Sequence, residues 1–235
     1  RSIGELSRLN FDDPGVEQFG VSKMADLGWE QLMDAYACIM CNRCQDVCPA
    51  YQTGKVLSPS ALEINKRYHF NNGGTTDVLM LDMISEEAVW ACTSCGACVD
   101  ICPVGNEPMR DILDMRRSLV LMDNQFPTQL QQAFKGMERT GNPWNISPEA
   151  RLDWAKGAKL PPYTPEHEYC LFTCCTTAYD TSADKGSQKA GIALLRLLEY
   201  AGVSYGTLGT GESCCGDMVD KIGATEVVAE LTGKN

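Results

Sequence analysis

Two runs of cysteines carry most of the chemistry that this 235-residue sequence can perform. Residues 38–48 read CIMCNRCQDVC and residues 92–102 read CTSCGACVDIC, and a proline follows each run. Both runs have the spacing C-x2-C-x2-C-x3-C-P. Thiolates bind metal, and a tight loop with cysteines three residues apart can wrap three corners of one small cluster. A fourth ligand must then come from elsewhere in the chain.

The spacing favours iron–sulfur clusters over zinc. Zinc sites built from C-x2-C pairs are the alternative, but they rarely use three cysteines at two-residue gaps before a C-P end. In two-cluster ferredoxins the fourth cysteine of each run binds the cluster of the other run. We therefore expect two neighbouring [4Fe-4S] clusters between which electrons can pass. The expected ligands are Cys38, Cys41, Cys44 and Cys102 for cluster 1, and Cys92, Cys95, Cys98 and Cys48 for cluster 2.

A second set of cysteines consists of the doublets Cys174-Cys175 and Cys214-Cys215. The pattern around them predicts strand, helix and strand at residues 169–173, 189–201 and 203–207. The two strands of such a unit run parallel, and the carboxyl ends of parallel strands meet at one edge of a sheet. We therefore expect the doublets to converge as a further metal site, with small residues packed at strand ends as the alternative. Cys170 lies inside the first strand, where core packing is expected.

Helices are expected to position the first eight cysteines. Ser58-Pro59 has the form of a helix N-cap followed by a proline in the first turn, and glycines at 73 and 74 end that helix. Apolar residues at helical spacing predict the remaining helices. The predicted helices cover residues 29–37, 58–70, 109–120, 127–140 and 217–231, with a further start at 147–148, and an apolar segment at about 77–90 leads to Cys92.

These elements predict an α+β fold. A mainly helical two-cluster domain of the alpha-helical ferredoxin type is followed by a partial α/β domain. The predicted parts are an irregular N-terminal arm at 1–28, the two-cluster domain at 29–125, a helical connector and linker at 126–168, and the doublet domain at 169–235. Two parallel strands make about half of an ordinary α/β domain, so the remaining strands are expected from a partner chain or from a C-terminal half that this sequence lacks.

The composition limits the classes of function. Thirteen cysteines together with long helical patterns argue against a disulfide scaffold and for metal binding in a reducing compartment. A formal net charge of −11 without a basic patch argues against a nucleic-acid partner. The printed sequence shows no apolar run of about 18 residues, no signal peptide, no glycine-rich phosphate loop and no flavin fingerprint.

Several stretches together resemble iron–sulfur subunits that carry a cysteine-rich CCG domain. This family includes the heterodisulfide reductase D subunit and the glycolate oxidase iron–sulfur subunit. The resemblance is strongest to membrane-bound oxidoreductases that pass electrons from electron-transfer flavoprotein to menaquinone. The stretches that carry it are ACIMCNRCQDVCPAYQTGKVLSP, VWACTSCGACVDICPV, DMRRSLVLMD, GNPWNIS, and the pair CCTTAYD and ESCCGD.

The resemblance makes residues 169–235 the N-terminal half of a CCG domain. The family binds a noncubane iron–sulfur cluster there with the pattern C…CCG…CxxC. Cys175, Cys214 and Cys215 match its first half, and Cys174 stands where the family often has glycine. A third cluster is implied if the domain is completed by the later C-x-x-C. Membrane-bound members also carry a haem-binding part ahead of a segment similar to RSIGELSRLN.

The expected function is that of an electron-transfer subunit of an oxidoreductase. It would pass electrons through two cubanes, from a protein donor such as electron-transfer flavoprotein to a quinone, a haem or the CCG site. The expected partners are other subunits of a membrane-associated redox complex, with a haem b membrane part. The expected location is the cytoplasmic face of the membrane. The alternatives are reduction of a disulfide, oxidation of an organic acid such as glycolate or lactate, and a non-catalytic redox sensor or scaffold.

Overall fold

The computed structural model describes residues 9–235, which form two compact units. The first unit consists of the described residues up to Phe126 together with residues 220–225, and the second of residues 127–219 and 226–235. Residues 1–8, the first part of the predicted arm and of the segment RSIGELSRLN, lie outside the described residues. The four-part division predicted from the sequence remains a prediction.

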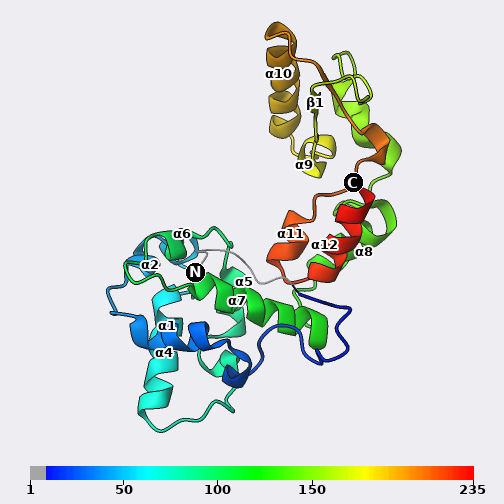
Figure 1. The fold of residues 1–235 in the computed structure, drawn as a ribbon. Helices are drawn as coiled ribbons and strands as arrows, with labels where there is room; N and C mark the ends of the chain where they lie inside the picture. The colour runs from blue at the N-terminus through cyan, green and yellow to red at the C-terminus, as the bar shows by residue number, and fades with distance from the viewer. Residues whose placement is uncertain (1–8) are drawn as a thin grey trace. The chain divides into compact units, whose positions relative to one another are not determined.

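The first unit is built from helices. Figure 1 shows α1 beside α4 and α2 beside α6, and both pairs are in contact. Ser58 caps α4 as predicted, because its hydroxyl accepts a hydrogen bond from the Ala61 amide at 3.2 Å. The helices are α1 (Trp29–Ala37), α2 (Arg43–Asp46), α3 (Pro49–Gln52), α4 (Pro59–Asn71), α5 (Glu86–Ala91), α6 (Ala97–Asp100) and α7 (Pro108–Arg117), which continues as a π-helical turn over Ser118–Met122.

The apolar segment at residues 77–90, which leads to the second cysteine run, contains two separate elements. This stretch forms a 3₁₀ turn, Met80–Asp82, followed by the separate helix α5. Leu79 is extended and forms an antiparallel bridge with Lys23. Ser85 starts the helix anew, since its hydroxyl accepts a hydrogen bond from the Ala88 amide at 3.3 Å. A capping serine in the middle of an apolar stretch therefore marks a break that periodicity alone misses.

The last part of the predicted arm belongs to the core of the first unit. Val21, Met24 and Leu27 are buried with residues of α4, α5 and α7. The Met24 amide donates to the Val78 carbonyl at 2.9 Å, which ties this segment to the chain ahead of α5. These residues lack helical periodicity because they lie across the core as a short extended piece with one 3₁₀ turn, Met24–Asp26.

A buried ion network joins three helices of this unit. Lys66 Nζ of α4 lies 2.8 Å from Glu63 and 2.5 Å from Asp111 of α7, and it donates to the Gln31 carbonyl of α1 at 2.9 Å. Burial raises the pKa of Glu63 to about 8. Burial alone would lower the pKa of Lys66, but the carboxylates of Asp111 and Glu63 hold it above its ordinary value.

The second unit combines helices with two short strands. The strands are parallel, with Tyr169 opposite Tyr205 and Cys170 opposite Gly206, which confirms the predicted direction. The single helix predicted for residues 217–231 is wrong, because Gly223 has a φ of 94° between two separate helices. The elements are α8 (Leu130–Thr140), a 3₁₀ helix (Pro148–Ala155), β1 (Tyr169–Cys170), α9 (Cys175–Ala178), α10 (Gly186–Tyr200), β2 (Tyr205–Gly206), α11 (Asp217–Lys221), which begins in this unit, and α12 (Thr225–Lys234).

The predicted burial of Cys170 is also wrong. Both residues of β1 are exposed, whereas both residues of β2 are buried. β2 has a neighbour on either side, since Thr207 just beyond it forms a parallel bridge with Pro162. β1 has only β2 as a described neighbour, and therefore Cys170 occupies an open edge rather than the interior of a sheet.

Candidate iron–sulfur site

The first cysteine run leaves the end of α1 and folds back on itself. Two residues of the loop, Met40 and Asn42, have positive φ angles of 57° and 60°. The Met40 amide donates to the Cys38 sulfur at 3.4 Å. These conformations reverse the chain, so that Cys41 lies at the tip of the loop and Cys44 in the short helix α2.

The second run repeats this geometry residue by residue. Ser94 and Gly96 have positive φ angles of 52° and 76°, at the positions of Met40 and Asn42. The Ser94 amide donates to the Cys92 sulfur at 3.4 Å, the same distance as in the first loop. Equal spacing in the sequence therefore produces equal loops, and the left-handed position is one that glycine and asparagine tolerate.

Two cysteines of the second run, Cys98 and Cys102, line a pocket with three cysteines of the first. Glu63 and Asn106 also border this pocket. Burial raises the pKa of the Cys44 thiol to about 11, and the nearby Cys38 and Cys102 contribute to this rise. The Asn106 amide donates to the Cys102 sulfur at 3.2 Å and orients it. The four cysteines predicted for cluster 1 that line the pocket are Cys38, Cys41, Cys44 and Cys102.

The cysteines of the other predicted set, which includes Cys98, are buried more deeply. Cys48 is buried in the core of the first unit, and Cys92 packs against that core. Burial raises the pKa of the Cys92 thiol, and Cys48 and Cys95 contribute to the rise. Burial also raises the pKa of Cys98 to about 12, with contributions from Cys92 and Cys44. Cys98 is thus close to cysteines of both predicted sets.

The donor atoms suit a cluster with several irons. All thirteen cysteines are free thiols. Within residues 9–235 no group of three or more His, Cys, Asp or Glu side chains is arranged for a single metal ion. A [4Fe-4S] cluster has a different requirement, because each of its four thiolates binds a different iron. Thiols from two loops that line one pocket meet this requirement.

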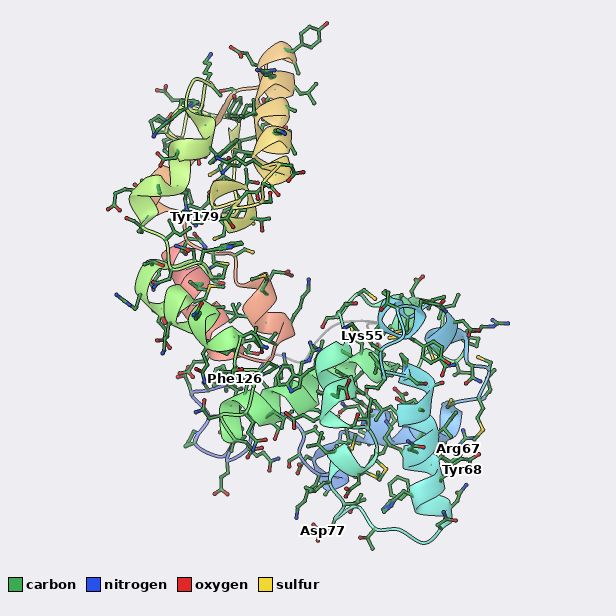
Figure 2. All side chains as sticks on the ribbon, turned by 180° about the vertical axis from the view of Figure 1, so that it is seen from behind. Lys55, Arg67, Tyr68, Asp77, Phe126 and Tyr179 are labelled. Carbon is green, nitrogen blue, oxygen red and sulfur yellow. The ribbon has the colours of Figure 1, made fainter. Side chains whose placement is uncertain are left out.

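Arginines support both loops, and the sequence analysis missed them. Arg67 on α4, labelled in Figure 2, donates to the Ala35 and Tyr36 carbonyls at 2.8 and 2.9 Å and also to the Cys38 carbonyl. These hydrogen bonds satisfy carbonyl groups at the C-terminal end of α1, which have no partner within the helix. They thereby fix the position from which the first cysteine run starts.

Arg116 on α7 performs the same task for the second loop. It donates to the Val89 carbonyl at 2.7 and 3.1 Å and to the Cys92 carbonyl at 2.6 Å. It also donates to the Ser94 hydroxyl at 3.3 Å, and its guanidinium lies over the Trp90 ring at 5.3 Å. Since Arg116 lies 24 residues from Cys92 in the sequence, no local pattern indicates the contact.

The structure brings two of the doublet cysteines together. Cys175, at the start of α9, and Cys214 are buried, and their thiols are hydrogen-bonded to each other. That hydrogen bond raises the pKa of Cys175 and is the main cause that lowers the pKa of Cys214 to about 6. Cys174 is half-buried and Cys215 is exposed. These thiols therefore lie in one region of the second unit, although several residues separate them from the ends of β1 and β2.

A buried ion pair that the sequence analysis also missed supports the doublets. Arg151 Nη1 lies 2.6 Å from Glu212, and its Nη2 donates to the Cys175 sulfur at 3.2 Å. Glu212 accepts hydrogen bonds from the amides of Thr173 and Cys174 at 2.9 and 3.0 Å. One signal could have indicated it, because Glu212 lies two residues ahead of Cys214 in ESCCGD.

Comparison with known families identifies the cysteine-rich part of the first unit. Residues 34–106 match the family of 4Fe-4S dicluster domains. This match covers both cysteine runs and confirms that the chain carries a domain for 4Fe-4S clusters. No solved structure matches the chain. None of the described helices has the length and apolar character that a membrane crossing requires.

Several curated proteins are similar to nearly the whole chain. An "EtfAB:quinone oxidoreductase" of Syntrophomonas wolfei is 34% identical over 97% of the chain and 37% of its own length. A "Probable iron-sulfur-binding oxidoreductase FadF" of Bacillus subtilis is 33% identical over 100% of the chain and 40% of its own length. The D subunit of the dihydromethanophenazine:CoB--CoM heterodisulfide reductase of Methanosarcina barkeri is 27% identical over 84% of the chain and 49% of its own length.

These relatives are homologues of the chain, which confirms the resemblance predicted from its motifs. All three are named as oxidoreductases or as subunits of a reductase, which supports an electron-transfer function for an oxidoreductase subunit. The chain spans less than half of the length of each of them.

Proposed function

We propose that the chain is an electron-transfer subunit that conducts electrons through two [4Fe-4S] clusters. Each cluster would be bound by three cysteines of one run and by the fourth cysteine of the other run. The observation that carries this proposal is the pocket in which Cys102, together with Cys98, meets the first three cysteines of the first run. When bound there, the clusters supply one-electron transfer. The same exchange would place Cys48 with Cys92, Cys95 and Cys98, whose thiols influence one another.

The chain itself would hold the clusters in a protected and fixed position. The two loops begin from helix ends that Arg67 and Arg116 brace through backbone carbonyls. Cys48 and Cys98 are buried in apolar surroundings, whereas Cys41 and Cys95 at the loop tips are exposed. This arrangement keeps water from the inner side of the site and leaves the tips accessible to a redox partner.

The donor and the acceptor follow from the relatives. We infer a protein donor of the electron-transfer flavoprotein type and a quinone as the eventual acceptor, because one relative is named an EtfAB:quinone oxidoreductase. A quinone lies in the lipid bilayer, so the chain would act at the cytoplasmic face of a membrane, held there by other subunits or by a haem b membrane part. The alpha-helical ferredoxin type is proposed for residues 29–125.

A second candidate function involves the doublet cysteines. Cys175, Cys214 and Cys215 would contribute to a third, noncubane cluster, as the first half of a CCG domain over residues 169–235. The paired thiols of Cys175 and Cys214 support this candidate, and one relative is named as part of a heterodisulfide reductase. In this candidate the two cubanes would supply electrons for the reduction of a disulfide, or accept them from an organic acid such as glycolate or lactate.

Reductive titration followed by electron paramagnetic resonance distinguishes conduction from a sensor or scaffold. We expect two reducible centres whose signals broaden each other when both are reduced, because exchanged ligands force the clusters to be neighbours. A single reducible centre, or two centres without magnetic interaction, would contradict the proposal. Mixing the reduced protein with purified flavoprotein, a quinone or a disulfide then identifies the partner that reoxidises it.

A further inference from the structure

The two cysteine loops are repeats of each other, but their surroundings differ in charge. Each loop is braced by one arginine from the helix that follows it, Arg67 on α4 or Arg116 on α7. Both arginines donate to the carbonyl of the first cysteine of their loop, Cys38 or Cys92. Because each arginine binds the same backbone group of its loop, the effects of the two arginines can be compared directly.

Arg116 is the more deeply buried of the two. Its relative exposure is 3%, whereas Arg67 is half-buried. Arginine keeps its charge in proteins. A charge acts more strongly in the low-dielectric interior than in contact with water, which screens it. The positive charge of Arg116 therefore acts on the Cys92 loop more strongly than that of Arg67 acts on the Cys38 loop.

The partners of the two loops increase this difference. The polar partners of Arg116 are carbonyl and hydroxyl oxygens, which leave its positive charge uncompensated. The pocket of the Cys38 loop, in contrast, is bordered by Glu63, whose pKa burial raises to about 8, so that it carries little charge near neutral pH. Lys66 lies next to Glu63 but pairs with Asp111, so this pair adds no uncompensated cation at the pocket.

Burial of the thiols acts in the opposite direction. The set predicted for cluster 2 contains two buried cysteines, Cys48 and Cys98, whereas the set for cluster 1 contains none. Burial disfavours added negative charge and so lowers a reduction potential. Without a nearby cation the second cluster would thus be the harder one to reduce. Arg116 is the cation that lies against this loop.

We propose that Arg116 is a positioning residue that places cluster 2 above cluster 1 in reduction potential, so that electrons entering at cluster 1 pass to cluster 2. This inference rests on the proposed function. A reduced cluster carries one more negative charge, and an uncompensated cation stabilises that state. The electron lost by one cluster reduces the other, and the transfer needs no further reactant.

The test is a redox titration by electron paramagnetic resonance on the cluster-loaded protein and two variants. Arg116→Gln removes the positive charge but keeps an amide group that can donate hydrogen bonds to the carbonyls. Arg116→Lys keeps the positive charge but loses the planar guanidinium group. We expect Arg116→Gln to lower the higher of the two reduction potentials by at least about 59 mV. For a one-electron couple this shift is a tenfold change in the equilibrium constant. Arg116→Lys should leave the higher wave nearly in place.

Arg67→Gln is the matched control in the equivalent position. It should shift only the lower wave, and by less, because Arg67 is half-buried. The inference is overturned if Arg116→Gln moves the lower wave, or moves neither while iron analysis shows both clusters present. It is also overturned if Arg116→Lys shifts the higher wave as far as Arg116→Gln does. A wild-type protein without two reducible centres would instead contradict the proposed function.

Discussion

Cys102 shows how far the spacing of residues determines the candidate site. It belongs by sequence to the second run, yet it lines, with Cys98, the pocket that three cysteines of the first run also line. The C-x2-C-x2-C-x3-C-P spacing predicts this exchange, because three closely spaced thiols saturate one side of a cluster and the fourth must cross over. The sequence alone thus predicts both sets of thiols, and their assignment to two clusters stays a prediction.

Serine substitutions test the exchange directly. Cys102→Ser should perturb the same paramagnetic signal as Cys41→Ser, because both residues are assigned to cluster 1. Cys48→Ser should instead perturb the signal that Cys95→Ser affects. The assignment is wrong if Cys102→Ser changes the signal shared with Cys95→Ser and leaves the other intact.

The charged residues around the thiols could not be predicted in the same way. Arg151 and Glu212 are 61 residues apart in the sequence, and each is an ordinary charged residue in its local context. Their pairing exists only because the fold buries both, and burial of a charge requires a partner. Such contacts depend on tertiary structure, which one sequence without relatives does not reveal.

Cys174 has a backbone conformation that favours glycine. Its φ of 61° and ψ of 148° lie in a region that residues with a side chain rarely occupy. Such strain costs on the order of 1–3 kcal/mol, against about 0.5–1 kcal/mol for the added freedom of glycine in the unfolded chain. Cys174→Gly should therefore raise the thermal midpoint of the cluster-loaded protein.

The matched control for Cys174→Gly is Thr176→Gly, two residues further on inside α9. A glycine in a helix lowers stability, so this variant should have a lower midpoint than the wild type. Differential scanning calorimetry under anaerobic, reducing conditions measures both. A thermal midpoint of Cys174→Gly below that of the wild type would show that the backbone at Cys174, whose amide donates to Glu212, is not strained.

Helix boundaries were predictable where a capping residue marks them. Ser58-Pro59 starts α4 as expected, and α1 covers the predicted residues 29–37. The breaks within 77–90 and 217–231 were not predicted, because they depend on tertiary contacts. Leu79 leaves the helical conformation to pair with Lys23, and Gly223 lies so close to the Arg116 backbone that a side chain would not fit.

The ion network of Lys66 should be essential for the packing of α1, α4 and α7. Lys66→Met leaves Glu63 and Asp111 buried without their cation, and removal of one partner from a buried pair costs about 3–5 kcal/mol. We expect a large fall in the thermal midpoint and earlier loss of cluster absorbance on heating. Lys55→Met is the control, since Lys55 is exposed and should tolerate the change (Figure 2). Equal midpoints for the two variants would contradict this.

At the scale of the whole molecule, the second unit exposes surfaces of a kind that other α/β domains cover. β1 has one described neighbour, and α10 exposes Leu194, Leu197 and Tyr200, the last at 93%. A two-stranded sheet with an open edge is marginal in water. The sequence predicted this state from the number of strand patterns, although it overestimated the length of each strand.

An isolated fragment of residues 166–235 should therefore not be a stable monomer. We expect it to aggregate or to lack dispersed amide signals in nuclear magnetic resonance, because its apolar helix face and strand edge have no cover. Light scattering gives the association state, and the whole chain at the same concentration serves as the control. A monomeric fragment with cooperative unfolding would contradict the expectation that this region needs further packing partners.

Iron and sulfide analysis of a Cys214→Ser/Cys215→Ser double variant tests the central claim most directly. The substitutions remove any contribution of the doublet cysteines and leave both loops of the first unit unchanged. Two [4Fe-4S] clusters require about eight irons and eight acid-labile sulfides per chain. We expect these values for anaerobically purified protein. A chain that contains about four irons at full loading, or zinc without sulfide, would contradict the assignment of two clusters.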